Sequence, residues 1–383
     1  MPLRLLYFSA CSLSGLADYA REQANAICGQ GVEVTLLTGP EFKSRPQDHY
    51  ELLPQLPARQ LFGSKTSRLS SRFATVRQIL GNVHALSNFV TSSGCKHILC
   101  GSYAEYLAPL WSGQLRRLAG KGVVFGTVVH DPVRDYVVGP TWWHRRSVAC
   151  AYSFLREAFV HEPVSLDTVQ PMPRLRTTVI PHGPYNFPPP AKSRETTRKE
   201  LNIPVDARVL LSFGGIRDGK NLDLTLPVLA KFPDVFLIVA GMEQSQGQKP
   251  VSFYQQLAAK LGVANRCRWV VRFLGEEEIG NFFNAADLIL LTYSRNFRSA
   301  SGVLNVAARY RKLCLASSGH SNLERVVKDY NLGIWVKPDS ERAITEGMFA
   351  LFSKPPFPDW KRYEEDNSWT RNAQLVIDKM FDN

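Results

Sequence analysis

The sequence predicts two α/β domains, each built on a parallel β-sheet with helices on its faces. Short apolar segments alternate with segments of helical periodicity along most of the 383 residues, which is the pattern of repeated strand–helix–strand units. Prolines also cluster near the middle of the chain, as expected of a break between two sheets. At about 150 residues per domain, the length fits two domains as well.

The first half opens on an apolar segment, residues 3–9. We interpret it as a first strand, because it lacks the charged-then-apolar order of a secretory signal. A helix is predicted from Gly15 to Cys28. Further strands of this half are predicted at residues 32–38, 97–100 and 123–129.

The second half repeats the alternation more clearly. Its predicted strands are residues 208–213, 235–240, 269–274, 288–292 and 313–316, and its predicted helices are residues 222–230, 253–261, 277–286 and 303–310. Because each strand is followed by a helix, the strands of this half are expected to run parallel.

The boundary between the halves is predicted near residues 185–195. Proline restricts the backbone and lacks an amide donor, so a cluster of prolines interrupts regular structure. Five stand close together here: Pro181, Pro184, Pro188, Pro189 and Pro190. We therefore expect an N-terminal domain of residues 1–187, a C-terminal domain of residues 188–365 and a last helix at residues 366–383. Parallel sheets bind ligands beyond the carboxyl ends of their strands, so we expect the domains to face each other across a cleft.

The cysteines and the apolar runs argue against several classes of protein. The seven cysteines are an odd number and include no Cys-x-x-Cys pair, which argues against a disulfide framework and a zinc site and favours a reducing compartment. No apolar run approaches the roughly 20 residues that cross a bilayer. We therefore expect a cytoplasmic protein without a transmembrane helix or a metal.

Positive charge is concentrated in one stretch of the first half. The net charge is +12, and no acidic residue lies between Glu51 and Glu105. Within residues 59–80, basic side chains accompany apolar residues at helical spacing. Such a segment suits a membrane surface, a phosphorylated substrate or nucleic acid, or is the ordinary cationic rim of a core-packed helix. No recognised nucleic-acid-binding module appears, so we expect no nucleic acid partner.

The strongest chemical signal is residues 212–221, Ser-Phe-Gly-Gly-Ile-Arg-Asp-Gly-Lys-Asn, between a predicted strand and a predicted helix. The glycines let the backbone turn tightly, and Arg217 and Lys220 bring two cations to the same place. A diphosphate needs this combination. The spacing is neither that of a Gly-x-Gly-x-x-Gly loop nor that of a Walker A loop. An ordinary glycine-rich turn with two solvated cations would contain the same residues.

The order of several motifs resembles glycosyltransferase family 4 (group 1), whose members have the GT-B fold of two Rossmann-like domains. Phe213-Gly214-Gly215-Ile216-Arg217-x-x-Lys220-Asn221 resembles the donor-phosphate motif of that family. Further similar segments follow in the family's order: residues 179–183, 273–275, 286–287, 299–317 and 363–380. The last of these resembles the helix that crosses back onto the N-terminal domain in this fold. The likeness is more secure after residue 175 than before it.

The resemblance implies a retaining transfer of a sugar from a UDP- or GDP-linked donor, with no other cofactor. Arg217 and Lys220 would hold the donor diphosphate and stabilise the charge that builds on the leaving nucleotide. They would do so in place of a metal, because the sequence contains no Asp-x-Asp. The other implied donor-binding residues are Gly15, Gly214, Gly215, Phe273, Leu274, Ser301, Gly302, Val303 and Asn305. Among these, residues 301–303 open a predicted helix, whose N-terminal amides suit an anion.

One departure from the family pattern concerns the donor ribose. The family has a Glu-x7-Glu pair across this loop and helix, and its second glutamate holds the ribose. The corresponding positions here are Arg298 or Ser299, and Val306 or Ala307. Asn305 is the nearest polar substitute, either as a ligand of a hydroxyl or as an ordinary helix residue.

Two features of the first half resemble the side of the family's site that faces the sugar and the acceptor. The segment 11–20 resembles a glycine loop, in which Gly15 permits a close approach and Ser12 or Ser14 is expected to cap the following helix. His130 follows the predicted strand 123–129 and resembles a histidine that contacts the transferred sugar or the acceptor, so we predict a catalytic role for it. On local grounds alone, a simple helix cap and a structural histidine explain the same residues. His182 lies at the expected interdomain turn.

The leading hypothesis is a glycosyltransferase in cell-envelope polysaccharide or glycolipid assembly. It would act on a glycan or lipid-linked acceptor, with residues 59–80 as a possible contact to the inner face of the membrane. A sugar-nucleotide epimerase of the same fold would need further carboxylates, which the sequence does not identify. A non-catalytic relative that binds a nucleotide-sugar or a partner is favoured by the missing glutamates and opposed by Arg217, Lys220 and His130.

Overall fold

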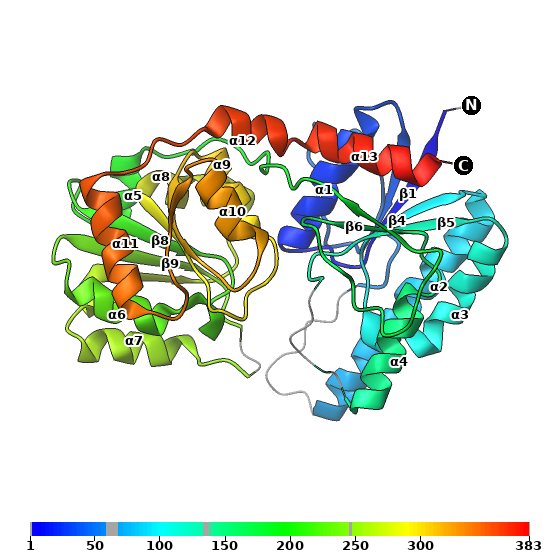
Figure 1. Ribbon diagram of the computed structural model, residues 1–383, viewed down its shortest axis with the longest axis horizontal. Coiled ribbons are helices and arrows are strands. Elements are labelled where there is room, and N and C mark those ends of the chain that lie inside the picture. The colour runs from blue at the N-terminus through cyan, green and yellow to red at the C-terminus, as the bar shows by residue number, and fades with distance from the viewer. Residues whose placement is uncertain (1, 59–67, 133–136, 138, 245–246, 383) are drawn as a thin grey trace. The chain divides into compact units, whose positions relative to one another are not determined.

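The computed structural model describes residues 2–58, 68–132, 137, 139–244 and 247–382, with side chains of the helix after the first gap described from residue 73. The chain forms two units. The first contains Met1–Gly183 and Asn367–Asn383, and the second contains Pro184–Asp366. Each unit is an α/β structure on one parallel sheet (Figure 1), so the predicted fold class is confirmed.

The first unit has a seven-stranded parallel sheet of order β3-β2-β1-β4-β5-β6-β7. Its elements are β1 (Arg4–Ser9), α1 (Gly15–Cys28), β2 (Glu33–Leu37), β3 (Glu51–Leu53), α2 (Arg68–Ser93), β4 (His97–Ser102), α3 (Ala108–Gly120), β5 (Val124–Val128), α4 (Thr141–Tyr152), β6 (Glu157–Val160), β7 (Arg176–Val179) and α13 (Trp369–Phe381). Strand order reverses at β1, which lies between β2 and β4. In a sheet of this kind, ligands bind beyond the carboxyl ends of the strands at such a point.

Alternating side chains of β1 divide the core of the first unit into two layers. Leu6 and Phe8 point to one face of the sheet, where α2, α3 and α4 cover them. Leu5 and Tyr7 point to the other face, where α1 and α13 cover them. A strand buried on both faces reads as a continuous apolar run, which is why this strand is visible in the sequence.

The last helix, α13, belongs to the first unit although it follows the second in sequence (Figure 1). It packs against α1, and Met380 near its end lies over Gly126 of β5, where a side chain in place of the glycine hydrogen would meet the Met380 sulfur at 2.5 Å. Near its start, Asn372 is fully buried and accepts a hydrogen bond from Gln23 of α1 at 2.7 Å. The chain therefore returns to the first unit through specific contacts, as the family resemblance implies.

The second unit has a six-stranded parallel sheet of order β10-β9-β8-β11-β12-β13. Its elements are α5 (Arg194–Glu200), β8 (Arg208–Phe213), α6 (Leu222–Ala230), β9 (Val235–Gly241), α7 (Val251–Lys260), β10 (Cys267–Val271), α8 (Glu276–Ala285), β11 (Leu288–Thr292), α9 (Gly302–Arg309), β12 (Leu313–Ser317), α10 (Asn322–Asp329), β13 (Gly333–Trp335), α11 (Glu341–Ser353) and α12 (Trp360–Asp366). Strand order reverses at β8, so the turn that follows β8 lies at the ligand-binding position of the sheet.

One predicted strand of the second unit is shifted. The strand expected at residues 269–274 is Cys267–Val271. The prediction omitted the first residues of this strand because Arg268 interrupts the apolar pattern. In the structure, the Arg268 guanidinium donates to the backbone carbonyls of Leu201 and Asn202 at the edge of the sheet. The apolar pair Phe273-Leu274 lies after the strand and before α8.

Candidate functional site

The turn after β8 is held in a conformation that requires glycine. Gly214 has φ +90°, which residues with side chains rarely adopt. Its amide donates to the Ala240 carbonyl at 2.9 Å. The backbone of Gly241 passes so close that a side chain there would meet the Gly214 carbonyl oxygen at 2.1 Å. The ends of β8 and β9 thus approach each other so closely that Gly241 leaves no room for a side chain, and this contact fixes the path of the turn.

Lys220 is buried within this turn without an acidic partner. It is 6% exposed, and its Nζ donates to the Phe213 carbonyl at the end of β8. Across the described residues, no carboxylate lies within ion-pair distance of Lys220 or Arg217. Burial and then the neighbouring Arg217 charge lower the pKa of Lys220 to about 7. A buried cation that the protein leaves unneutralised is costly, and a bound anion would remove that cost.

The N-terminus of α9 lies beside the same turn. A side chain at Gly214 would come within 3.5 Å of the Lys220 Nζ and 3.7 Å of Val303, in the first turn of α9. Ser301 caps this helix, because its hydroxyl accepts from the Leu304 amide at 3.3 Å. The Lys220 ammonium and a helix N-terminus therefore lie beside Gly214, with the charge of Arg217 acting on Lys220, and cations and helix N-termini both attract anions.

Neighbouring side chains brace the backbone of the turn. The Asp218 carboxylate accepts from the Lys249 amide at 3.0 Å and from the Tyr254 hydroxyl at 2.7 Å. Asn221, with φ +52°, donates to Asp339 at 3.0 Å. The Thr292 hydroxyl donates to the Lys220 carbonyl at 3.1 Å. The carboxylates of Asp218 and Asp339 thus bond to groups other than the two cations, which keeps Arg217 and Lys220 available for a ligand.

The other predicted donor-binding residues of the second unit lie in several places. Gly215 lies in the turn after β8, and Gly302 is the first residue of α9. Leu274 packs in the hydrophobic core, whereas Phe273 is 55% exposed. Asn305 is 3% exposed, accepts from the Tyr363 hydroxyl at 2.6 Å and donates to the Ser301 carbonyl at 3.4 Å. In this structure Asn305 therefore ties α9 to α12, and its amide oxygen already has a partner.

In the first unit, the prediction that Ser12 or Ser14 caps α1 is wrong. Neither hydroxyl makes a capping bond; that of Ser12 donates to the Glu41 carboxylate at 2.8 Å. Ser14 has φ +79°, a strained conformation for a residue with a side chain. Gly15 is the first residue of α1, directly after this strained position.

His130 follows β5 and lies in a cluster of aromatic rings. The ring of Tyr19 from α1 stands edge-on to it, with ring centres 4.6 Å apart, and the ring of His161 lies at 5.7 Å. The His130 Nε2 atom is buried and has no hydrogen-bond partner among the described residues. Burial, and then the neighbouring His161, lower the pKa of His130 to about 3, so the ring is neutral at physiological pH.

The sequence prediction missed most of this cluster. His161 follows β6 and His182 follows β7, with ring centres 5.1 Å apart, and Trp369 of α13 lies 5.5 Å from His182. A signal was present, because a histidine follows each of three consecutive strands, and parallel strands end at the same edge of a sheet. Trp369 gave no such signal, since it is nearly two hundred positions away in sequence.

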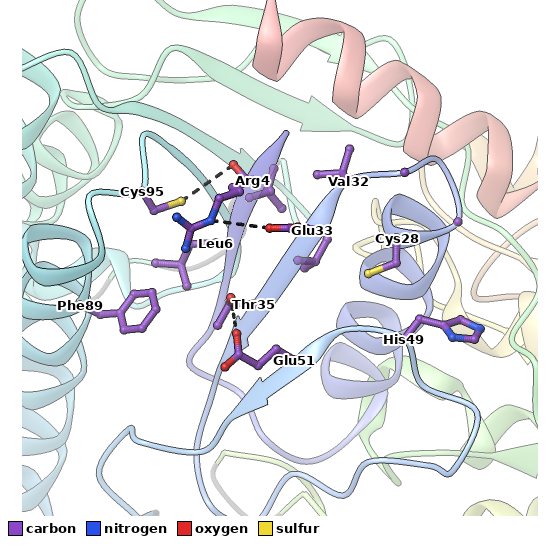
Figure 2. Close-up of a pocket in the computed structure, with 14 residues that line it drawn as sticks. Arg4, Leu6, Cys28, Val32, Glu33, Thr35, His49, Glu51, Phe89 and Cys95 are labelled. Carbon is purple, nitrogen blue, oxygen red and sulfur yellow. Dashed lines mark hydrogen bonds and ion pairs between the residues drawn. The ribbon is translucent and has the colours of Figure 1, made fainter. Parts of the chain in front are cut away.

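Two other features of the described residues bear on ligands. No group of three or more His, Cys, Asp or Glu side chains is arranged to hold a metal ion. A cavity of about 700 Å³ lies at the amino ends of β1 and β2 (Figure 2). Four of its polar side chains pair within the protein, Arg4 with Glu33 at 3.9 Å and Thr35 with Glu51 at 3.0 Å. It lies at the opposite end of the strands from the histidines, and we assign no ligand to it.

Residues 193–376, which include the turn after β8 and α9, match the model of the family described as Glycosyl transferases group 1. These residues, a little under half of the chain, are similar to the group 1 glycosyltransferases. The match begins after the proline-rich segment and ends within the last helix of the chain.

Curated relatives match over a part of the chain of similar length. A D-inositol 3-phosphate glycosyltransferase of Streptomyces coelicolor is 30% identical over 189 residues, which are 46% of this chain and 38% of the relative. The enzyme of the same name from Mycolicibacterium smegmatis is 30% identical over 160 residues, 39% of this chain and 36% of the relative. The chain thus spans well under half the length of the curated relatives it matches.

Solved glycosyltransferase structures share the fold of the whole chain. A glycosyltransferase from Rickettsia africae covers 100% of this chain and 99% of its own, with a TM-score of 0.68 at 15% identity. WaaG, a glycosyltransferase involved in lipopolysaccharide biosynthesis, covers 100% of both chains with a TM-score of 0.64 at 17% identity. HepE of Anabaena, solved with UDP and glucose, covers 99% of this chain and 96% of its own with a TM-score of 0.63 at 16% identity. At these identities the likeness concerns the GT-B fold.

Proposed function

We propose that this protein transfers a sugar from a nucleotide-sugar donor to a glycan or lipid-linked acceptor in the assembly of a cell-envelope polysaccharide or glycolipid. The observation that carries the proposal is the turn after β8. It places the buried Lys220 and the nearby Arg217, neither paired with a carboxylate among the described residues, beside a helix N-terminus. A diphosphate fits this arrangement because it brings the negative charge that the site lacks.

The two cations would act on the leaving group. Cleavage of the bond between the sugar and the nucleotide leaves negative charge on the diphosphate, and fixed cations that meet this charge lower the barrier to the reaction. Because Lys220 has a pKa of about 7 in the absence of an anion, a bound diphosphate would favour its protonated form. We propose that this pair does the work that a metal does in other transferases, and that the configuration of the sugar is retained.

The first unit would supply contacts to the sugar or the acceptor. We propose that His130 binds a hydroxyl group, because its Nε2 atom is buried and has no partner among the described residues. Gly15 lies at the start of α1, and Tyr19 one turn later on the same face contacts His130. The glycine loop and the histidine thus belong to one region of this unit.

A non-catalytic protein that binds a nucleotide-sugar is the second candidate. It is supported by Val306 and Ala307, which are buried apolar residues where the family has a glutamate that holds the ribose. Asn305, the nearest polar residue, is engaged with Tyr363. An epimerase would require carboxylates near the turn that are available to the sugar, whereas Asp218 and Asp339 are bonded to the protein.

The function is tested by thermal unfolding with UDP-, GDP- and ADP-linked sugars. A ligand that binds only the folded protein at a hundred times its Kd contributes about 2.7 kcal/mol, so the matching nucleotide-sugar should raise Tm by about 5 °C or more. Uridine, guanosine and adenosine are the controls, because they lack the diphosphate. Absence of a shift with every nucleotide-sugar would contradict the proposal. Slow hydrolysis of the bound donor then separates the enzyme from the non-catalytic protein.

We also propose contact of the first unit with an anionic membrane surface. Within the segment 59–80, residues 59–67 lie outside the described residues, but Phe73 and Arg77 of α2 are exposed. At the start of α4, Trp142 is 65% exposed and is followed by the exposed Arg145 and Arg146. Aromatic and cationic side chains of this kind favour the interface of a bilayer. No helix in the described part of the chain is long and apolar enough to cross a bilayer.

Sedimentation with vesicles tests this contact. The protein should bind vesicles that contain phosphatidylglycerol and bind phosphatidylcholine vesicles much less, because each arginine near an anionic surface contributes about 1 kcal/mol. Replacing Arg145 and Arg146 with Gln should reduce binding roughly thirtyfold by the same arithmetic. Arg116→Gln with Arg117→Gln on α3, which removes the same charge elsewhere, is the matched control. Equal binding of both double variants would contradict the placement on α4.

A further inference from the structure

Two of the three histidines that follow β5, β6 and β7 direct Nδ1 at a backbone carbonyl. The Nδ1 of His161 lies 3.2 Å from the Ile180 carbonyl oxygen, and that of His182 lies 2.9 Å from the Gly183 carbonyl oxygen. The backbone of Gly101 lies close enough to His130 to favour its charged form, and its buried Nε2 has no partner among the described residues, so we assign the contact with Gly101 to Nδ1. A carbonyl oxygen only accepts hydrogen bonds. The Nδ1 atoms of His161 and His182 therefore carry a proton, and we assign the proton of His130 to Nδ1 as well.

Because burial keeps the rings neutral, it also determines the hydrogen-bonding role of the Nε2 atom. Desolvation is the largest cause that lowers the pKa of all three imidazoles, to about 3 for His130 and about 4 for His161. A neutral imidazole has one proton, and here that proton is on Nδ1. The Nε2 atom of His130 therefore presents a lone pair and no N–H. It can accept a hydrogen bond from a hydroxyl group, but it cannot donate one.

Tyr19 stands at the centre of the cluster. Its ring lies edge-on to His130 at 4.6 Å and to His182 at 5.0 Å, and is tilted against His161 at 5.4 Å. Edge-on contacts at these distances are the favoured arrangement of aromatic rings. Tyr19 is 1% exposed, so it has little room to move. The orientation of the His130 ring consequently depends on where Tyr19 lies.

The last helix fixes the hydroxyl end of Tyr19. Asn372 of α13 donates to the Tyr19 hydroxyl at 3.1 Å and to the Pro181 carbonyl at 2.7 Å, and it accepts from Gln23 at 2.7 Å. Trp369, also of α13, packs on Tyr19 with ring centres 4.9 Å apart. A buried network whose members are all bonded holds a single conformation. The position of Tyr19 is therefore set from the C-terminal end of the chain.

We propose that Tyr19 is a positioning residue that keeps the His130 imidazole oriented as a hydrogen-bond acceptor for a hydroxyl of the sugar or acceptor, and that α13 anchors Tyr19 through Asn372. This inference rests on the proposed function, since His130 has a role only if a hydroxyl-bearing ligand binds. In this arrangement the ligand hydroxyl donates its hydrogen bond to the Nε2 atom of His130, and α13 serves to hold Tyr19 in place. This also means that His130 does not act as a proton donor in the transfer.

Histidine-selective ¹⁵N NMR tests the proton positions without any ligand. Long-range ¹H–¹⁵N spectra distinguish the two neutral tautomers, and loss of one signal in His130→Gln assigns the resonance. We expect His130 as the Nδ1–H tautomer in the wild type, and a mixture of tautomers both in Tyr19→Leu, which removes the ring, and in Tyr19→Phe, which removes the hydroxyl that Asn372 anchors. An Nε2–H proton on His130 in the wild type, or an unchanged tautomer in Tyr19→Leu, would overturn the proposal. If Tyr19→Leu does not fold, Asn372→Ala, which removes only the anchor, takes its place.

A double-mutant cycle tests how Tyr19 acts. Turnover is measured as UDP-glucose hydrolysis, and GDP- or ADP-glucose replaces it if thermal unfolding selects that nucleotide. Tyr19→Leu should lower kcat about tenfold in the wild type and have no further effect in His130→Ala. A purely structural role would give the same loss in both backgrounds, which would refute positioning. If His130→Ala alone leaves kcat unchanged, the proposed role of His130 in catalysis fails, and the NMR result still decides the tautomer and its anchor.

Discussion

The first unit should lose stability as the pH falls from 7 to 5, by about 2 kcal/mol for each of His130 and His161. In the folded protein their pKa values are lowered to about 3 and about 4 from the ordinary value of 6.5. Between these values the unfolded chain binds more protons than the folded one. The stabilisation is therefore complete above pH 6.5 and is lost as the pH falls toward the folded pKa values. His182, whose pKa is also lowered by burial, adds to the loss.

Urea unfolding between pH 5 and pH 8, followed by circular dichroism, measures this loss. His161→Gln removes one of the buried groups that titrate, so its stability should depend less on pH, by about 2 kcal/mol over the same interval. His84→Gln on α2 is the matched control, because His84 is exposed and belongs to no cluster of rings. An unaltered pH dependence in His161→Gln would show that His161 is not held neutral in the folded state.

Elements whose residues form one periodic pattern were predictable from the sequence. The bounds of β8, α6 and β11 agree with the prediction, because buried parallel strands read as short apolar runs and the helices between them keep their own period. The start of β10 was missed because a charged residue interrupts the apolar pattern there, and the sequence does not show that the Arg268 side chain can pack its aliphatic part against the sheet. That side chain lies over the Phe236 ring and donates to carbonyls at the edge of the sheet.

The candidate site was predictable only where it is local in sequence. Arg217 and Lys220 lie in one turn, so their proximity follows from the spacing. The burial of Lys220 does not follow from it, and neither does the approach of α9, which comes close to the turn from about eighty residues away. In the same way, Tyr19, His130 and Trp369 meet only through the order of the strands and the return of the last helix. Sequence spacing carries no information about such contacts.

Replacing Arg217 with Ala and Lys220 with Met should weaken UDP binding by roughly a hundredfold to ten-thousandfold. Each charge-assisted hydrogen bond to a phosphate contributes about 1.5–3 kcal/mol, so the pair contributes about 3–6 kcal/mol. The folded state should not suffer, because Lys220 is a buried cation without a carboxylate partner among the described residues, and Met keeps most of its volume. Loss of binding would then reflect the site and not unfolding.

Two exposed cations of the same unit provide the control. Arg208 and Lys231 form exposed ion pairs with Asp234 and Glu341. Arg208→Ala with Lys231→Met removes the same charge as the site variant, so it accounts for any general electrostatic attraction of UDP. We expect wild-type affinity from this control and an unchanged unfolding temperature in both double variants.

Calorimetric titration of UDP at pH 7 decides whether the turn after β8 binds the diphosphate of a nucleotide-sugar. We expect saturable binding to the wild type and to the control variant, and binding at least a hundredfold weaker when Arg217 and Lys220 are both replaced. Equal affinity of UDP for the wild type and for the Arg217→Ala, Lys220→Met variant would contradict this expectation.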